Sequence, residues 1–178
     1  TDNYAGGRLA AQALARQGAE SVLVLAGTGE HVPSRRRIEG FQSIFPDAEV
    51  VYTSHSLAQA ELVALEEIRR SRPDAVFAVN GWIAQPVHFA VSQVGFAVPD
   101  DVMLVAFDDF HPEISEQFGL TSVVQHVSKL ADRAVNLLID RVENRAPPGE
   151  RIVLESGLIP RGSCRDPVAV PAQGGATT

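Results

Sequence analysis

Two adjacent carboxylates, Asp108 and Asp109, directly follow the apolar run 102–107 and are the residues best suited to chemistry. Ligands of open α/β sheets collect outside the carboxyl ends of the strands, so a carboxylate there is well placed to hold one. The pair could act as a general acid and base or as half of a metal site. Either role needs further partners, for which His111 and Glu113 are near enough to consider. A surface histidine in an irregular loop is the favoured interpretation of His111.

Asn80 closes another apolar segment, 75–79, and Trp82 follows almost at once. Proteins bind sugars with that combination, because hydroxyls need donors and acceptors while the C–H face of the ring stacks on an aromatic side chain. Asn is also a common turn former and Trp a common core residue, and for this pair alone the structural interpretation is favoured. Gln125, after the segment 121–124, is a further polar group at a possible strand end.

Two other patterns could bind phosphate, but both have plainer interpretations. The glycines at 27 and 29 follow a strand as in dinucleotide-binding proteins, yet Val32 stands where the third glycine is needed, so a turn is favoured. The arginines at 35–37 are consecutive, and on a helix they would point about 100° apart, so they cannot form one surface. We expect one of them to face a cleft. Cys164 lacks the signature of a nucleophile, and hydrolase chemistry is unsupported.

The elements that position these residues alternate along the first part of the chain. Short apolar runs predict strands at 21–26, 50–53, 75–79 and 102–107. Helical spacing and end signals mark the segments between them, from Asp2 to Gly18, Ile38 to Phe45, Ser56 to Ile68 and Ile83 to Gly95. Alternation of this kind implies right-handed crossovers between parallel strands, so the predicted fold is α/β, a doubly wound, mainly parallel sheet flanked by helices.

The alternation ends at Asp109. The sequence then predicts an irregular loop, a short segment at 121–125, a helix at 127–144, and a closing hairpin or bent strand from 151–155 and 158–160. Residues 166–178 are rich in Pro, Ala, Gly and Thr and have almost no core-forming side chains, which predicts a flexible tail.

The composition limits the function classes. With 178 residues, 45% of them hydrophobic, the chain can form one globular domain with its own core. A formal net charge of -7 should repel a phosphate backbone, so any work on nucleic acid needs a module outside this chain. A single cysteine cannot form an internal disulfide. No apolar run approaches the roughly 18 residues that span a membrane and no secretory segment opens the chain, which predicts a cytoplasmic protein without a membrane partner.

Five stretches, taken in order, resemble one protein family. They are Asp2-Asn3-Tyr4-Ala5-Gly6-Gly7 with Leu9-Ala10, the segment from Ser34 with Arg37 and Gly40-Phe41, Pro99-Asp100-Asp101-Val102 leading to Phe107-Asp108-Asp109, Leu120-Thr121-Ser122-Val123 with Gln125, and Pro160-Arg161-Gly162-Ser163. Together they resemble the effector-binding domain of the LacI/GalR family of bacterial transcription regulators, from Asp2 to about Arg165.

The resemblance implies a domain with two lobes of the periplasmic-binding-protein type, an effector in the cleft between them, and an upstream helix-turn-helix domain. By this resemblance residues 1–165 are the C-terminal portion of the effector-binding domain, mostly its second lobe, with 127–144 a helix of the first lobe. The DNA-binding domain and most of the first lobe would be absent from this chain. A homodimer that reaches operator DNA only through the missing domain is implied, without a cofactor.

The resemblance also assigns a ligand site. Arg37 corresponds to the arginine that holds ligand hydroxyls, Asn80 to the cleft asparagine, Asp108 to the carboxylate that accepts from a sugar hydroxyl, and Gln125 to the last cleft residue. His55 falls near a position where some members place an aromatic side chain.

The chain departs from the family pattern around the asparagine. Gly81 stands where members usually have Asp, and Gln85-Pro86 interrupts the start of the following helix. These changes leave the ligand open, and Trp82 is expected to reshape the wall of the cleft. A sugar or sugar derivative is the expected effector, with a purine as the alternative.

The hypothesis for function is therefore an effector sensor that is not an enzyme. Two rivals remain: an exported solute-binding protein of a transport system, and a Rossmann-type enzyme that uses Asp108 and Asp109. The helix at 127–144 presents a further question, because its stripe of Leu130, Ala134, Leu137 and Leu138 would face water. We predict that this stripe is buried by self-association or by folding back onto the lobe.

Overall fold

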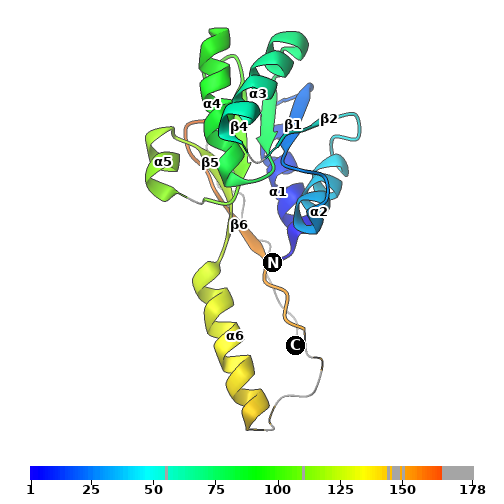
Figure 1. The fold of residues 1–178 in the computed structure, drawn as a ribbon, viewed down its shortest axis with the longest axis vertical. Helices are drawn as coiled ribbons and strands as arrows, with labels where there is room; N and C mark the ends of the chain where they lie inside the picture. The colour runs from blue at the N-terminus through cyan, green and yellow to red at the C-terminus, as the bar shows by residue number, and fades with distance from the viewer. Residues whose placement is uncertain (55, 110, 144, 146–148, 150, 166–178) are drawn as a thin grey trace.

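The computed structural model describes residues 1–54, 56–109, 111–143, 145, 149 and 151–165. Among these residues, six strands form one sheet in the order β2-β1-β3-β4-β5-β6 (Figure 1). The strands are β1 Val22–Ala26, β2 Glu49–Tyr52, β3 Ala75–Ala78, β4 Met103–Phe107, β5 Thr121–Gln125 and β6 Ser156–Ile159. All neighbours pair in parallel except β5 and β6, which pair antiparallel. The predicted mainly parallel sheet flanked by helices is confirmed.

Helices cover both faces of the sheet. They are α1 Asn3–Ala15, α2 Val32–Gln42, α3 Leu57–Ser71, α4 Gly81–Val94, α5 Pro112–Gln117 and α6 Val127–Val142. Alternate residues of β1 point to opposite faces: Val22 and Val24 join the core beneath α1 and α2, whereas Leu23 and Leu25 join the core beneath α3 and α4. Because β1 is buried on both faces, it reads in the sequence as a continuous apolar run.

Side-chain caps start α1 and α3. Asp2 Oδ1 accepts from the N–H of Ala5 at 2.9 Å, and Ser56 Oγ accepts from the N–H of Gln59 at 3.4 Å. Gly95 ends α4 with a φ of 86°, a left-handed conformation that glycine adopts without steric cost. The caps at Asp2 and Ser56 and the end at Gly95 were all expected. α4 itself continues through Pro86.

α1 and α2 touch through two glycines. A Cβ on Gly7 would lie 1.9 Å from the carbonyl oxygen of Arg37, and a Cβ on Gly40 would lie 2.0 Å from the carbonyl oxygen of Tyr4. No other residue type fits at either position without moving a helix backbone. This contact fixes α2, and with it Arg37, against α1.

Two predictions of secondary structure beyond Asp109 are wrong. The expected irregular loop contains the short helix α5, which begins at Pro112, a residue whose fixed φ suits the first helical position. The expected hairpin is absent, because residues 151–155 have no strand conformation and β6 pairs instead with β5. Ile152 and Val153 are exposed, and Leu154 accepts at its carbonyl from the N–H of Asp2 at 2.9 Å.

α6 lies beyond the edge of the sheet and away from the other helices (Figure 1). None of its residues is buried, and Leu130, Leu138 and Val142 are 42%, 64% and 74% exposed. The prediction that α6 folds back onto the lobe is wrong, because α1 to α4 already cover both faces and β5 leads directly outward into α6. Burial by self-association stays a prediction. The predicted tail at 166–178 lies outside the described residues.

Candidate functional site

A hollow of about 560 Å³ lies at the carboxyl ends of the parallel strands. It is lined by the loop after β1, the first turns of α2, the start of α4 after β3, the residue after β4, the end of β5 and the start of the chain. Five residues singled out in the sequence line it: Arg37, Asn80, Trp82, Asp108 and Gln125. The sixth, His55, lies outside the described residues. Residues up to 88 positions apart are therefore brought to one place.

Arg37 is the buried member of the three consecutive arginines. It is 5% exposed, whereas Arg35 and Arg36 are exposed, as their angular separation on a helix requires. Its Nη1 donates to the carbonyl oxygen of Val79 at 3.0 Å and to Asp108 Oδ2 at 3.2 Å. These contacts tie α2 to the ends of β3 and β4.

Two more contacts complete the surroundings of Arg37. Its Nε donates to Asn3 Oδ1 at 2.9 Å, and its guanidinium carbon lies 3.6 Å from the centre of the Phe107 ring. Burial lowers the pKa of Arg37 below its ordinary value, while the neighbouring carboxylate of Asp108 acts in the opposite direction. An arginine in this position stays charged at physiological pH, so its charge is balanced by Asp108 before any ligand arrives.

Asp108 has an unusual backbone. Its φ is 72°, in the left-handed region that non-glycine residues rarely adopt, and its N–H donates to the carbonyl oxygen of Val123 at 2.7 Å. Its Oδ1 accepts from Gln125 Nε2 at 2.6 Å, and Gln125 Oε1 accepts in turn from Thr1 Oγ1 at 2.6 Å. The carboxylate is therefore held between a cation on one side and an amide on the other.

Asn80 lies between β3 and α4. It caps α4, because its Oδ1 accepts from the N–H of Ile83 at 3.3 Å, and it also lines the hollow. Gly27 lies beside both Asn80 and Trp82: a Cβ there would be 3.8 Å from Asn80 Nδ2 and 3.7 Å from Trp82 Cζ2. The amide and the indole thus form one wall against the loop after β1.

Asp109 points to a different place from Asp108. It forms a two-pronged ion pair with Arg161, whose Nη2 and Nη1 lie 2.8 Å and 3.2 Å from its carboxylate oxygens. Burial acts to raise the pKa of Asp109, but hydrogen bonds from Arg161 and Ser115 outweigh it and hold the pKa below its ordinary value. The two carboxylates do not share a site, so the acid–base pair considered from the sequence is not formed.

A metal site is likewise not assembled. Within the described part of the chain, no three His, Cys, Asp or Glu side chains gather as metal ligands would. His111 and Glu113, considered as partners of the carboxylates, lie exposed at the start of α5.

The sequence missed several residues that line the hollow. Asn3 was not among the expected ligand residues, yet its Oδ1 accepts from Arg37. His31 and Ser34 lie at the start of α2, with His31 Nδ1 and Ser34 Oγ 3.2 Å apart. The position of Ser34 one turn before Arg37 was the available signal, since residues three apart share a helix face.

The hollow can hydrogen-bond a small polar molecule. Arg37 Nη2 has no acceptor among the described residues, and each oxygen of Asp108 accepts only one hydrogen bond from them. Donor and acceptor capacity therefore remain side by side, next to the apolar surfaces of Trp82 and Leu130. Such a surface suits a neutral molecule that carries hydroxyls and an apolar face.

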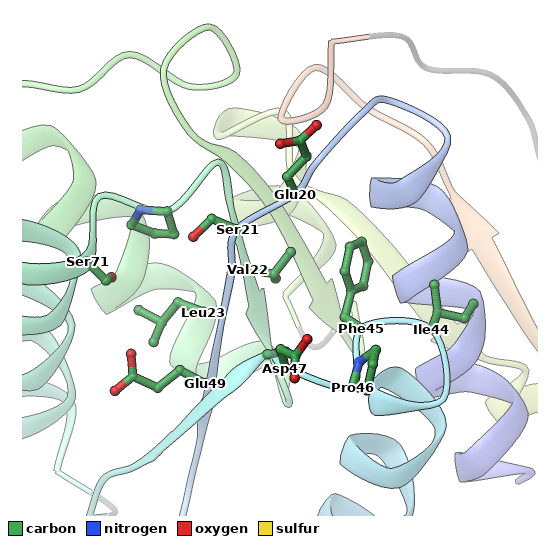
Figure 2. A pocket seen from close by; sticks show the side chains of 12 residues that line it. Glu20, Ser21, Val22, Leu23, Ile44, Phe45, Pro46, Asp47, Glu49 and Ser71 are labelled. Atoms are coloured by element: carbon green, nitrogen blue, oxygen red, sulfur yellow. The ribbon is translucent and has the colours of Figure 1, made fainter.

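A second hollow, of about 350 Å³, lies at the opposite end of the parallel strands (Figure 2). It is formed at the amino ends of β1, β2 and β3. Glu20, Asp47 and Glu49 lie at separate points around it, and Glu49 is paired with Arg70. Without converging donors and acceptors, it lacks the features that make the first hollow a binding site.

The sequence and the fold match a known family. Residues 11–164 match the periplasmic binding protein-like domain. The repressor PurR of Mannheimia succiniciproducens is 27% identical over 176 residues, which cover 92% of this chain and 52% of that protein. The chain spans about half the length of the curated relatives it matches.

Solved structures agree. A LacI family transcriptional regulator from Enterococcus faecalis, solved with bound ribose, has a TM-score of 0.82 and 29% identity, and the match covers 92% of this chain and 61% of that one. The complex of the transcriptional regulator CelR with cellobiose has a TM-score of 0.77 and 27% identity over 91% of this chain and 52% of that one. Within the described residues, no helix has both the length and the apolar character that crossing a membrane requires.

Proposed function

The chain belongs to the periplasmic binding protein-like domain family, in the form found in LacI-family regulators, and from this premise we propose that it is the effector-sensing part of a transcriptional regulator. The observation that carries this proposal is the cluster of Arg37, Asp108, Gln125, Asn80 and Trp82 around one hollow. The cluster recognises a molecule and has no group placed to transform it.

The ligand is a neutral sugar or sugar derivative. Arg37 and Asp108 balance each other at 3.2 Å and keep hydrogen-bonding capacity for hydroxyls, which suits a neutral polyol better than an anion. Two relatives carry carbohydrates in their solved structures, ribose in one and cellobiose in the other. A purine is the alternative ligand, and the test below includes it.

The complete protein carries a first lobe, to which α6 belongs, and a helix-turn-helix domain before it. Residues 1–165 then form mainly the second lobe, and the protein acts as a cytoplasmic homodimer on operator DNA. Two observations support this organisation: the chain spans half of its relatives, and α6 exposes an apolar face while its Leu130 lines the hollow. A first lobe packed on α6 would cover that face and close the hollow into a cleft.

Regulation follows from a difference in affinity. The two lobes have two relative orientations, and a ligand shifts the equilibrium between them only if it binds one orientation more tightly than the other. That shift changes how the dimer presents its DNA-binding domains. Arg37, Asn80 and Asp108 supply directional contacts from this lobe. Gly81, which departs from the usual family pattern, and Trp82 line this wall and are where the ligand preference is set.

The rival functions are less well supported. The relatives are named as transcriptional regulators, which favours this function over an exported solute-binding protein. The enzyme alternative required Asp108 and Asp109 to work together, and Arg161 holds Asp109 apart.

The test uses the complete protein and a panel of D-ribose, cellobiose, adenine and guanine, with binding measured by calorimetry and operator binding by fluorescence anisotropy. Asp108→Ala and Arg37→Ala should each weaken sugar binding about 10- to 100-fold, the range expected for one hydrogen bond to a charged group, while operator binding survives. Arg70→Met, an exposed arginine at the other edge of the sheet, is the matched control and should bind as the wild type does. Unchanged responses in both site variants would refute the proposed site.

A further inference from the structure

We propose that Arg161 is a positioning residue for the ligand site, acting through Asp109 on the backbone of Asp108. Arg161 does not line the hollow and touches neither Arg37 nor Gln125 among its hydrogen-bond partners. It follows β6 and lies 53 positions from Asp108 in the sequence. The part of the proposal that concerns ligand affinity rests on the proposed function; the part that concerns the backbone does not.

The conformation that needs support is that of Asp108. With a φ of 72°, its Cβ is crowded against its own carbonyl group, and this conformation costs free energy relative to a right-handed or extended one. Among the described residues other than glycine, only Arg72 shares a positive φ, and Arg72 ends a helix. Residues held in this way persist where their surroundings over-determine them.

Two restraints lie on either side of the strained residue. The N–H of Asp108 donates to the carbonyl oxygen of Val123, which fixes the backbone where it leaves β4. The next residue, Asp109, is held by both terminal nitrogens of Arg161, at 2.8 Å and 3.2 Å, and both side chains are largely buried. A planar guanidinium that meets a carboxylate in two places fixes its orientation as well as its distance.

Arg161 is itself fixed. Its Nη1 donates to the carbonyl oxygen of Leu120 at 2.7 Å. Its backbone N–H donates to Thr121 Oγ1 at 2.9 Å, and Thr121 Oγ1 donates back to its carbonyl oxygen at 3.0 Å. The guanidinium is thus anchored to the start of β5, the strand that also supplies Gln125 to the site.

The consequence is that Asp108 has little freedom to relax. If Asp109 were released, rotation of the backbone into an ordinary conformation would turn the Asp108 carboxylate away from Arg37 Nη1 and Gln125 Nε2, now 3.2 Å and 2.6 Å from it. Arg161 therefore keeps the Asp108 carboxylate pointing into the hollow before the ligand binds, and this lowers the entropy cost of ordering the site on binding.

The first test needs no ligand and uses the 178-residue chain. A positive φ gives a strong nuclear Overhauser effect between the amide and α protons of the same residue, so NMR reads the Asp108 backbone directly. Arg161→Met should abolish this signal at Asp108 while the rest of the spectrum stays dispersed; Arg161→Lys should retain part of it, and Arg70→Met all of it. If Arg161→Met does not fold, Asp109→Asn gives the same reading with a smaller change. A folded variant that keeps the signal overturns the proposal.

The second test is a double-mutant cycle in the complete protein, with D-ribose and cellobiose as probes. Arg161→Met should weaken binding about tenfold in the wild-type background and cause no further loss in the Asp108→Ala background, because both changes remove the same aimed carboxylate. Equal losses in both backgrounds would mean that Arg161 acts only on general stability, and would refute the proposal. A wild-type protein that binds neither probe would count against the proposed ligand class, and the NMR result would still decide the role of Arg161.

Discussion

Replacing Gly7 with alanine sets two opposite effects against each other at the contact between α1 and α2. In an open helix the change would stabilise, since alanine is favoured over glycine by about 1 kcal/mol in a helix interior. Here the new Cβ would lie 1.9 Å from the carbonyl oxygen of Arg37 and 2.8 Å from its Cα. Those atoms belong to a helix backbone and cannot rotate out of the way.

The geometry of the contact gives the size of the loss of stability. An ordinary contact begins at 3.4 Å, so the two helices must separate locally by about 1.5 Å, and Gly40 would lose its equally close contact with Tyr4. Overpacking of a core by one methyl group costs about 1–3 kcal/mol, and a rigid obstacle belongs at the upper end. After the helix gain is subtracted, about 2 kcal/mol of destabilisation remains, which lowers the melting temperature by about 4–8 °C for a domain of this size.

Thermal and urea unfolding of the 178-residue chain measure this loss. Gly162→Ala is the control, since nothing lies within 4 Å of a Cβ there, and it should change stability by less than about 0.5 kcal/mol. Because the displaced atoms belong to Arg37, Gly7→Ala should also weaken ligand binding in the complete protein. A Gly7→Ala variant as stable as the wild type, or more stable, would show that the helix contact is softer than its geometry implies.

Two further predictions concern buried groups away from the site. His88 stacks on Phe118 with ring centres 4.3 Å apart, its Nδ1 is buried without a hydrogen-bond partner in the described structure, and burial lowers its pKa below 6.5. The unfolded chain therefore takes up a proton on His88 more readily than the folded chain, so the stability of the fold should be greatest above about pH 6.5 and decline below it. His88→Phe should remove this part of the decline when the free energy of unfolding is measured against pH. An unaltered pH profile would contradict the assignment. Ser163→Ala should cost about 1–3 kcal/mol in denaturant unfolding, because Ser163 Oγ accepts from the buried N–H of Thr121 and donates to the carbonyl oxygen of Leu104; a loss below about 0.5 kcal/mol would mean that water replaces the hydroxyl.

The first part of the fold was predictable because its signals are local. The apolar runs that form β1, β3 and β4 are short and buried on both faces, and the caps at Asp2 and Ser56 follow from a side chain and an amide three positions on. The face of α2 that carries Arg37 also follows from helical spacing. Local patterns therefore predicted the strand ends and indicated that one of the three arginines faces a cleft, and the resemblance identified that arginine as Arg37.

What could not be predicted depends on long-range partners. Residue type alone does not distinguish the aspartates at 108 and 109; the resemblance assigned Asp108 to the cleft, and only the fold shows that Asp109 pairs with Arg161, 52 positions away. The positive φ of Asp108 has no local mark either. α5 was missed because six residues are too few to show a helical period. The hairpin was wrongly expected because the sequence of a segment does not indicate with which strand it pairs.

The short segment 160–163 has a consequence for how the protein is made. It follows β6 and hydrogen-bonds with Thr121, Leu104 and Gly119, so it adds contacts at the amino ends of β4 and β5 to the direct pairing between these two strands. Chains leave the ribosome from the N-terminus, so β5 emerges before both its antiparallel neighbour β6 and this closing segment. The nascent polypeptide therefore needs protection from aggregation until this segment has emerged, and a protease or a premature stop codon that removes the segment leaves these hydrogen bonds unmade.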